Sequence, residues 1–230
     1  MFFVLFTACS SSYSAQDAAE NALISDENVT IEIDDWISFY PAESSTELGF
    51  IFYPGGKVEA ESYAPVLRRI AEQGIQAHIA ILPLDLALLD QDAAAEIMEA
   101  EDPELWILGG HSLGGVGAAN LASKDANVVG LSLWASYPAS SVDLSGWEYP
   151  VQSITGSNDA ILNLENYEEA KERLPSSTDW IDIDGGNHSQ FGDYGFQDGD
   201  GEAAITPEEQ WTIIAQETST MIFSIYPEED

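Results

Sequence analysis

Basic residues are scarce in this chain of 230 residues. Lys and Arg together number 6, against 41 Asp and Glu, so the formal net charge is −35. Such an excess of negative charge repels nucleic acids and anionic membrane surfaces, and neither is expected as a partner. The carboxylates also repel one another, which destabilises a compact state unless molar salt shortens the screening length to about 3 Å. The composition therefore predicts a saline habitat. The alternative, an acidic face that recruits a cationic partner, requires clustered carboxylates, whereas these are spread along the whole chain.

Cysteine occurs once, at Cys9, so no disulfide can form within the chain. An apolar start, residues 1–6, leads through Thr7-Ala8 to this cysteine, and a serine-rich tract follows. This order resembles the end of a bacterial lipoprotein signal, although the apolar run is shorter than usual and no basic residue precedes it. It predicts an exported protein, either a cell-envelope lipoprotein with a lipid anchor at Cys9 or a secreted one. The alternative is a frayed terminus or a misassigned start. No stretch approaches the about 18 apolar residues that a membrane span needs.

Eight short segments have the composition of strands. Two of them, 29–33 and 36–40, alternate apolar and polar residues around Asp34-Asp35, as a hairpin with one solvated face does. The other six are almost continuously apolar, which is typical of strands covered on both faces. These six are 49–53, 75–82, 105–108, 128–134, 151–155 and 180–183.

Segments with helical spacing lie between the predicted strands. Tyr63, Val66, Leu67 and Ile70 fall on one helical face, and Thr206-Pro207-Glu208-Glu209 reads as a capping box that begins a last helix. Strands that alternate with helices indicate a parallel sheet wrapped on both sides. We therefore expect residues 1–27 to be a signal remnant and polar lead. Residues 28–230 are expected to form one three-layer α/β domain, with a mostly parallel sheet and an antiparallel hairpin at its N-terminal edge.

The motif with the most chemical content is Gly110-His111-Ser112-Leu113-Gly114. It stands directly after the apolar run 105–108 and directly before the small-residue run 115–122. A serine at such a strand-to-helix turn is held in a strained conformation that exposes its hydroxyl, and the flanking glycines avoid collisions there. The pattern therefore predicts that Ser112 is a nucleophile toward an acyl carbon.

A serine hydroxyl needs a base to take its proton, and histidine is the usual one. The chain has three histidines. His78 lies inside an apolar strand, which favours a core role, and His111 adjoins the serine too closely to reach back to it. His188 lies in the loop after the last predicted strand, where it can be delivered to the top of the sheet. It is the predicted base.

The imidazole in turn needs a carboxylate that fixes its tautomer. Asp159 immediately follows the strand 151–155 and would lie at the same sheet edge as Ser112. Asp193, five residues after His188, is the main rival, and Asp182 and Asp184 are weaker ones. With Asp159 the order along the chain is Ser, Asp, His, as in one large hydrolase superfamily.

Negative charge develops on the carbonyl oxygen when the serine attacks, so backbone N–H groups must point there. Leu113, directly after the nucleophile, is one expected donor. The second is expected from the turn 53–57, Tyr-Pro-Gly-Gly-Lys, with Gly56 as first choice and Lys57 as second. The alternative is that this turn merely reverses the chain.

Taken together these pieces resemble an α/β-hydrolase, of the compact dienelactone-hydrolase-like and esterase-like branches. The resemblance runs from about residue 28 to the C-terminus, through 53–56, 110–115, 156–159 and 186–188. It implies Ser112 as nucleophile, His188 as base and then acid, Asp159 as its orienting partner, and an oxyanion hole from Leu113 and the Gly56 region. It also implies that neither a metal nor an organic cofactor takes part. Dienelactone hydrolases carry cysteine where this chain has serine, which favours ordinary esters.

The expected substrate is a small or short-acyl carboxylic ester, cleaved through an acyl-enzyme. Only 137–150 intervenes between the sixth and seventh sheet strands, so a cap is expected to be minimal or absent. Trp134, Tyr137 and Trp147 are candidates for the acyl pocket, or else core or surface aromatics. The segment 198–201, Asp-Gly-Asp-Gly, is a substrate-side loop or an incomplete calcium site. The alternative functions are acyl transfer with the same triad and a lipid-anchored binding protein of the same fold.

Overall fold

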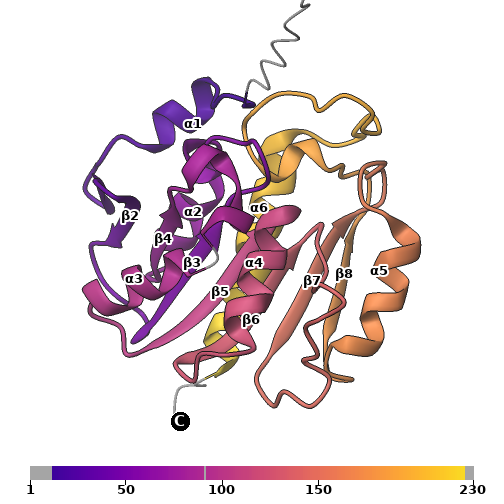
Figure 1. Ribbon diagram of the computed structural model, residues 1–230. Helices are drawn as coiled ribbons and strands as arrows, with labels where there is room; N and C mark the ends of the chain where they lie inside the picture. Colours follow the sequence, from indigo (N-terminus) through magenta and orange to yellow (C-terminus); the bar gives the residue numbers. More distant parts are fainter. Residues whose placement is uncertain (1–11, 91, 226–230) are drawn as a thin grey trace, which may run out of the picture.

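The computed structural model describes residues 12–90 and 92–225. Cys9, and with it the predicted lipid anchor, lies outside the described residues. Eight strands form one sheet in the order β1-β2-β4-β3-β5-β6-β7-β8 (Figure 1). Their bounds are β1 Val29–Ile33, β2 Trp36–Pro41, β3 Leu48–Tyr53, β4 Gln76–Ala80, β5 Leu105–His111, β6 Val128–Trp134, β7 Val151–Gly156 and β8 Asp179–Ile183.

The sheet is parallel except at its N-terminal edge. Strand β2 runs antiparallel to both β1 and β4, whereas every pair from β4 to β8 is parallel. All six residues of β3 and all seven of β6 are buried, because helices cover both faces of these central strands. The predicted mostly parallel sheet with an antiparallel hairpin is confirmed.

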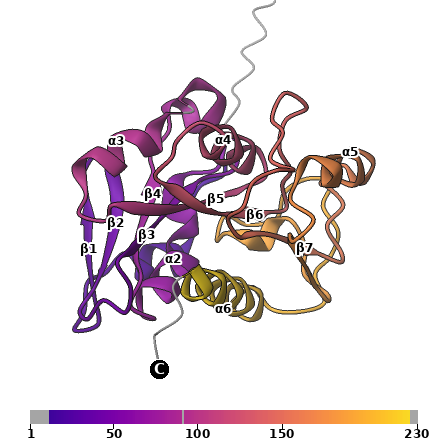
Figure 2. The same cartoon turned by 90° about the horizontal axis from the view of Figure 1, so that it is seen from below.

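Six α-helices cover the sheet. Their bounds are α1 Asp17–Ala22, α2 Ala64–Ala71, α3 Ala93–Ala100, α4 Leu113–Ala122, α5 Leu164–Ala170 and α6 Pro207–Ile225. Figure 2 shows α3, α4 and α5 on one face and α2 and α6 on the other, which makes three layers as predicted. The capping box that begins α6 is present: the Thr206 N–H donates to Glu209 Oε2 over 2.8 Å, and the Glu209 N–H to Thr206 Oγ1 over 3.2 Å.

Residues assigned from the sequence to a polar lead are part of the folded unit. Helix α1 buries Ala19 and Ala22 and packs on α2, and Tyr13 forms a parallel bridge with Val58. A six-residue helix whose buried face consists of two alanines has no apolar periodicity to recognise, which is why the sequence did not reveal it. The described domain therefore begins well before residue 28.

The connection between β6 and β7 is short and open. All of 135–150 is described, and it consists of turns, bends and irregular chain. No cap therefore covers the carboxyl ends of the strands from this connection. Among the helices of the described ranges, none is both long enough and apolar enough to cross a bilayer.

Candidate active site

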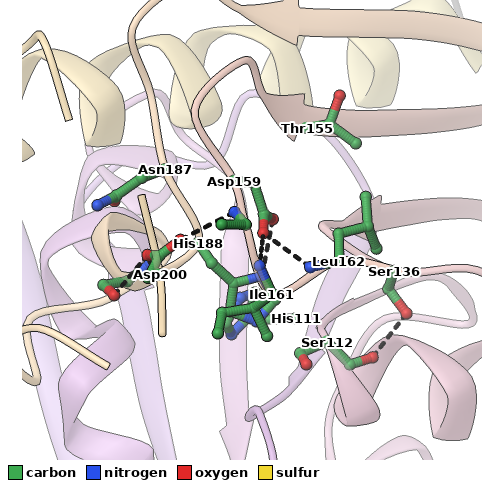
Figure 3. Close-up of polar contacts among 12 residues, drawn as sticks. His111, Ser112, Ser136, Thr155, Asp159, Ile161, Leu162, Asn187, His188 and Asp200 are labelled. Carbon is green, nitrogen blue, oxygen red and sulfur yellow. Dashed lines mark hydrogen bonds and ion pairs between the residues drawn. The ribbon is translucent and has the colours of Figure 1, made fainter. Parts of the chain in front are cut away.

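Ser112 occupies the apex between β5 and α4. Its φ and ψ are 51° and −119°, a strained conformation for a residue with a side chain. The turn is tight: a Cβ on Gly110 would stand 2.5 Å from the Gly115 N, and one on Gly114 would collide with the Tyr53 carbonyl oxygen. Ser136 Oγ donates a 2.6 Å hydrogen bond to the Ser112 carbonyl, which supports the turn from β6 (Figure 3).

His188 and Asp159 meet at the same sheet edge. His188 Nδ1 lies 2.7 Å from Asp159 Oδ2, and both side chains are 2% exposed. The other carboxylate oxygen, Oδ1, accepts the N–H groups of Ile161 and Leu162, each over 2.8 Å (Figure 3). An acceptor so placed holds the His188 proton on Nδ1 and leaves Nε2 with a free lone pair. This is the state that a general base requires.

The other two histidines are buried and uncharged. Burial lowers the pKa of the His78 imidazole to about 3, and its Nδ1 bonds Ser38 Oγ over 3.0 Å within the sheet. Burial, and then the neighbouring His188, lower the pKa of His111 well below its ordinary value. The rival carboxylate Asp193 instead accepts the N–H of Ala19 in the first turn of α1 over 2.9 Å.

Ser112 and His188 line the same two adjoining hollows. One, of about 250 Å³, is bounded by the turn 55–58, Leu86 and Gln197. The other, of about 230 Å³, is bounded by Val116, Ala135, Ser136, Tyr137 and residues 161–163. No hydrogen bond within the described residues joins the Ser112 hydroxyl to His188. Such a bond is often long in a substrate-free enzyme and forms when substrate is bound.

The two predicted sources of oxyanion donors lie side by side. The Leu113 N–H opens helix α4, where no preceding turn supplies an acceptor. A Cβ placed on Gly56 would be 3.4 Å from Leu113 Cβ, and in the described part of the chain the Gly56 N–H has no acceptor. The Lys57 N–H, in contrast, donates to the Asp85 carbonyl over 2.7 Å. Lys57 is therefore not a free backbone donor, and Gly56 is.

The three aromatic pocket candidates lie in different surroundings. Tyr137 lines the 230 Å³ hollow. Trp134 is 0% exposed, with its ring centroid 4.3 Å from that of Phe52, so it belongs to the core and lines neither hollow. Trp147 packs against the core cluster beneath α4 and contacts Tyr149, away from both hollows. A large aromatic residue at the end of an apolar strand is equally expected in a core, and the sequence could not separate the two roles.

Asp200 was not recognised in the sequence as part of the site. Its Oδ2 accepts the N–H and the hydroxyl of Ser189 over 2.7 and 2.6 Å, and its Oδ1 accepts the N–H of Ala160 over 3.2 Å (Figure 3). Ser189 follows His188 and Ala160 follows Asp159. One carboxylate thus joins the two loops that carry the predicted base and its partner. The described residues contain no group of three or more His, Cys, Asp or Glu arranged to hold a metal ion.

Gln210 braces the base loop from the other side. This residue of α6 is 0% exposed; its Oε1 accepts the Asn187 N–H over 3.1 Å and its Nε2 donates to the Asn187 carbonyl over 2.8 Å. Gln210 falls four residues before Ile214 on the buried face of α6. A polar residue at a buried helical position was the signal that could have revealed it.

Asp200→Asn is expected to lower the kcat of any reaction that uses His188 as base about 100-fold, because displacing a reacting group by about 1 Å has that effect. The substitution replaces one carboxylate oxygen with an NH₂ group, which is a donor. This group would face N–H or O–H groups that now donate to Asp200, so the hydrogen bonds that join the two loops are lost. Steady-state kinetics on an ester measures it. Asp198→Asn is the matched control, since Asp198 is exposed in the same loop. Equal kcat in both variants would contradict the assigned role.

More than half of the chain matches the model of one protein family. Residues 49–212, from β3 into α6, match the model of the alpha/beta hydrolase family. The chain belongs to the alpha/beta hydrolase family. The match includes Gly56, Ser112, Asp159 and His188, so the family assignment and the clustered residues concern the same part of this hydrolase.

Solved structures of hydrolases share the fold of this alpha/beta hydrolase. An alpha/beta hydrolase enzyme from the metagenome of sediments of the Mar Chica lagoon, Morocco, is 20% identical, with a TM-score of 0.61 over 84% of this chain and 100% of the other. A predicted CIB-like hydrolase from Thermoplasma acidophilum is 15% identical (TM-score 0.62, 84% and 98% covered). A novel esterase from Mycobacterium tuberculosis is 14% identical (TM-score 0.58, 87% and 95% covered). No curated protein matches the sequence. At these identities the likeness concerns the fold alone.

Proposed function

We propose that this hydrolase cleaves small or short-acyl carboxylic esters through Ser112, His188 and Asp159. The observation that carries the proposal is the strained Ser112, which lines the same hollows as a buried His188 bonded to Asp159. The esterases among the structural relatives are in keeping with it. A serine hydroxyl held in this way, with a base beside it, is the arrangement that acyl chemistry requires.

The reaction proceeds in two halves. Ser112 Oγ attacks the ester carbonyl carbon while His188 Nε2 takes the hydroxyl proton, and Asp159 stabilises the imidazolium that forms. The oxyanion of the tetrahedral intermediate accepts the N–H groups of Gly56 and Leu113. The intermediate collapses to an acyl-enzyme when His188 returns the proton to the departing alcohol. Water, deprotonated by the same imidazole, then attacks the acyl carbon, and the acid and free Ser112 result.

The size and openness of the hollows favour small esters and water as the acceptor. Each hollow holds about 250 Å³ or less, and 135–150 forms no cap over them. Long acyl chains would extend into solvent with little apolar surface to cover them. Because water reaches the acyl-enzyme freely, hydrolysis is favoured over transfer to another acceptor.

A fluorophosphonate probe tests the proposal on protein purified in molar salt. The probe is expected to add once, on the peptide that contains Ser112, and to block hydrolysis of all p-nitrophenyl esters to the same extent. Without the probe, acetate and butyrate are expected to be hydrolysed much faster than palmitate. Ser112→Ala removes the label, while Ser123→Ala, an exposed serine at the end of α4, keeps it. A wild type inert to the probe and to all three esters would leave a non-catalytic binding protein instead.

A further inference from the structure

The Tyr63 hydroxyl lies buried between two loops of the site. It accepts the Gly55 N–H over 3.0 Å and lies 2.8 Å from His111 Nδ1. Gly55 precedes Gly56, and His111 precedes Ser112 and Leu113. The hydroxyl therefore contacts the residue directly before Gly56 and the residue two positions before Leu113, although Tyr63 itself comes from the turn before α2.

The directions of these hydrogen bonds are assigned from the donor and acceptor capacities of the three groups. The Gly55 N–H can only donate, so the single hydroxyl proton of Tyr63 is free to go to His111 Nδ1. Burial keeps His111 neutral, with its pKa well below the ordinary value. A neutral imidazole that accepts at Nδ1 carries its proton on Nε2. The series runs from the Gly55 N–H through the Tyr63 O–H to His111 Nδ1, and the His111 Nε2–H is left without an acceptor in the described residues.

The hydrogen bonds of the Tyr63 hydroxyl connect the two loops beyond the point where the strands before them are paired in the sheet. The ladder between β3 and β5 ends at the pair Tyr53 and Gly110. Beyond that pair the chain of Gly56 and the chain of Leu113 leave separate strands, and the spacing of their N–H groups depends on what connects them. The Tyr63 hydroxyl supplies a connection.

Packing alone does not account for the hydroxyl. The ring of Tyr63 lies against Phe52, with centroids 4.9 Å apart, and a phenylalanine would fill the same space. A hydroxyl in such a site is costly to bury unless it is bonded. Gly55 is fitted to it as well, because a Cβ there would stand 2.8 Å from both the Tyr63 hydroxyl and His111 Nδ1.

We propose that Tyr63 and His111 are positioning residues that set the spacing of the Gly56 and Leu113 N–H groups for the oxyanion. This inference rests on the proposed ester hydrolysis. The two donors then act together on an oxygen that carries charge only in the transition state, so the link bears on kcat more than on substrate binding.

Tyr63→Phe tests the inference, because it removes the hydroxyl and keeps the ring. With p-nitrophenyl butyrate, kcat is expected to fall about 10- to 100-fold and KM to change less than about threefold. This is less than the roughly 10²- to 10³-fold loss when an oxyanion donor is removed, because here the donors are displaced and not removed. Affinity for an alkyl boronic acid, which forms a tetrahedral adduct on the serine, should fall with kcat/KM. Tyr40→Phe is the control, since Tyr40 lies on β2 and its hydroxyl bonds Glu101 at the end of α3, away from the site.

Variants of His111 keep the inference testable if Tyr63→Phe folds poorly. Asn presents an acceptor near the position of Nδ1, whereas Leu presents none, so His111→Asn is expected to retain at least fivefold more kcat than His111→Leu at equal melting temperature. An active wild type whose kcat is unchanged in Tyr63→Phe, or equal kcat in the two His111 variants, overturns the inference alone. An inert wild type overturns the proposed function, and this inference with it.

Discussion

Ser112→Ala, His188→Ala and the double variant are each expected to reduce kcat about 10⁶-fold, and the double variant to be no slower than either single one. All three variants lose the same step, the transfer of the serine proton to the imidazole, because this step needs both Ser112 and His188. His188 has a single position for this step, fixed by the 2.7 Å bond to Asp159. Single-turnover and steady-state rates on p-nitrophenyl butyrate measure the effect.

The same series distinguishes the triad from a general loss of structure. Ser112→Ala should keep the melting temperature of the wild type within a few degrees. His188→Ala and the double variant should melt lower, because the buried Asp159 carboxylate loses its imidazole partner, so all rates are compared below the lowest melting temperature. Additive losses in the double variant would mean that Ser112 and His188 act in separate steps. A His188→Ala variant with more than a hundredth of the wild-type kcat would assign the base elsewhere.

Melting temperature and activity are expected to rise steeply with salt. In the described residues only three carboxylates pair with Arg or Lys, namely Asp26 and Glu72 with Arg68, and Glu168 with Lys171. The rest of the 41 acidic residues contribute mostly repulsion, which about 0.1 M salt screens poorly and molar salt screens well. If molar salt relieves about 5 kcal/mol of repulsion in the folded state, the free energy of unfolding increases by that amount. In a chain of this size the melting temperature should then increase by on the order of 10–20 °C between 0.1 and 3 M KCl.

Scanning calorimetry and ester hydrolysis across a KCl series measure this prediction. Sucrose at matched water activity is the control, because it is excluded from the protein surface without screening charge. If KCl and sucrose stabilise equally, repulsion is not the cause. Equal melting temperatures at 0.1 and 3 M KCl would remove the physical basis for a saline habitat.

The eight strands could be read from the sequence because each carries its own signal. Continuous apolar runs such as 128–134 are expected only where both faces of a strand are covered, and the structure gives β6 those bounds. Helix α1 carries no such signal, since its stability comes from contacts with α2 that local pattern does not encode. Contacts with the rest of the fold, and not the local sequence, determine whether such short helices form.

The residues of the candidate site also fall into two groups, those that the sequence predicts and those that it does not. Ser112, Asp159 and His188 lie in the loops or turns that follow β5, β7 and β8, and position along a parallel sheet is enough to bring them to one edge. Asp200 and Gln210 lie far along the chain and act by bonding backbone groups of the loops, a role that any polar residue could fill. Lys57 was a candidate donor only because the bond of its N–H to Asp85 cannot be seen in the sequence.

The lack of a cap in the connection between β6 and β7 also affects which step limits the rate of turnover. Where a helical cap must swing aside, opening or product release often limits the rate. Here 135–150 has no such element, so this connection places no gate between the two hollows and bulk solvent. Under the proposed ester hydrolysis we expect acylation or deacylation to set the rate, so that kcat follows the electrophilicity of the ester and not the viscosity of the medium.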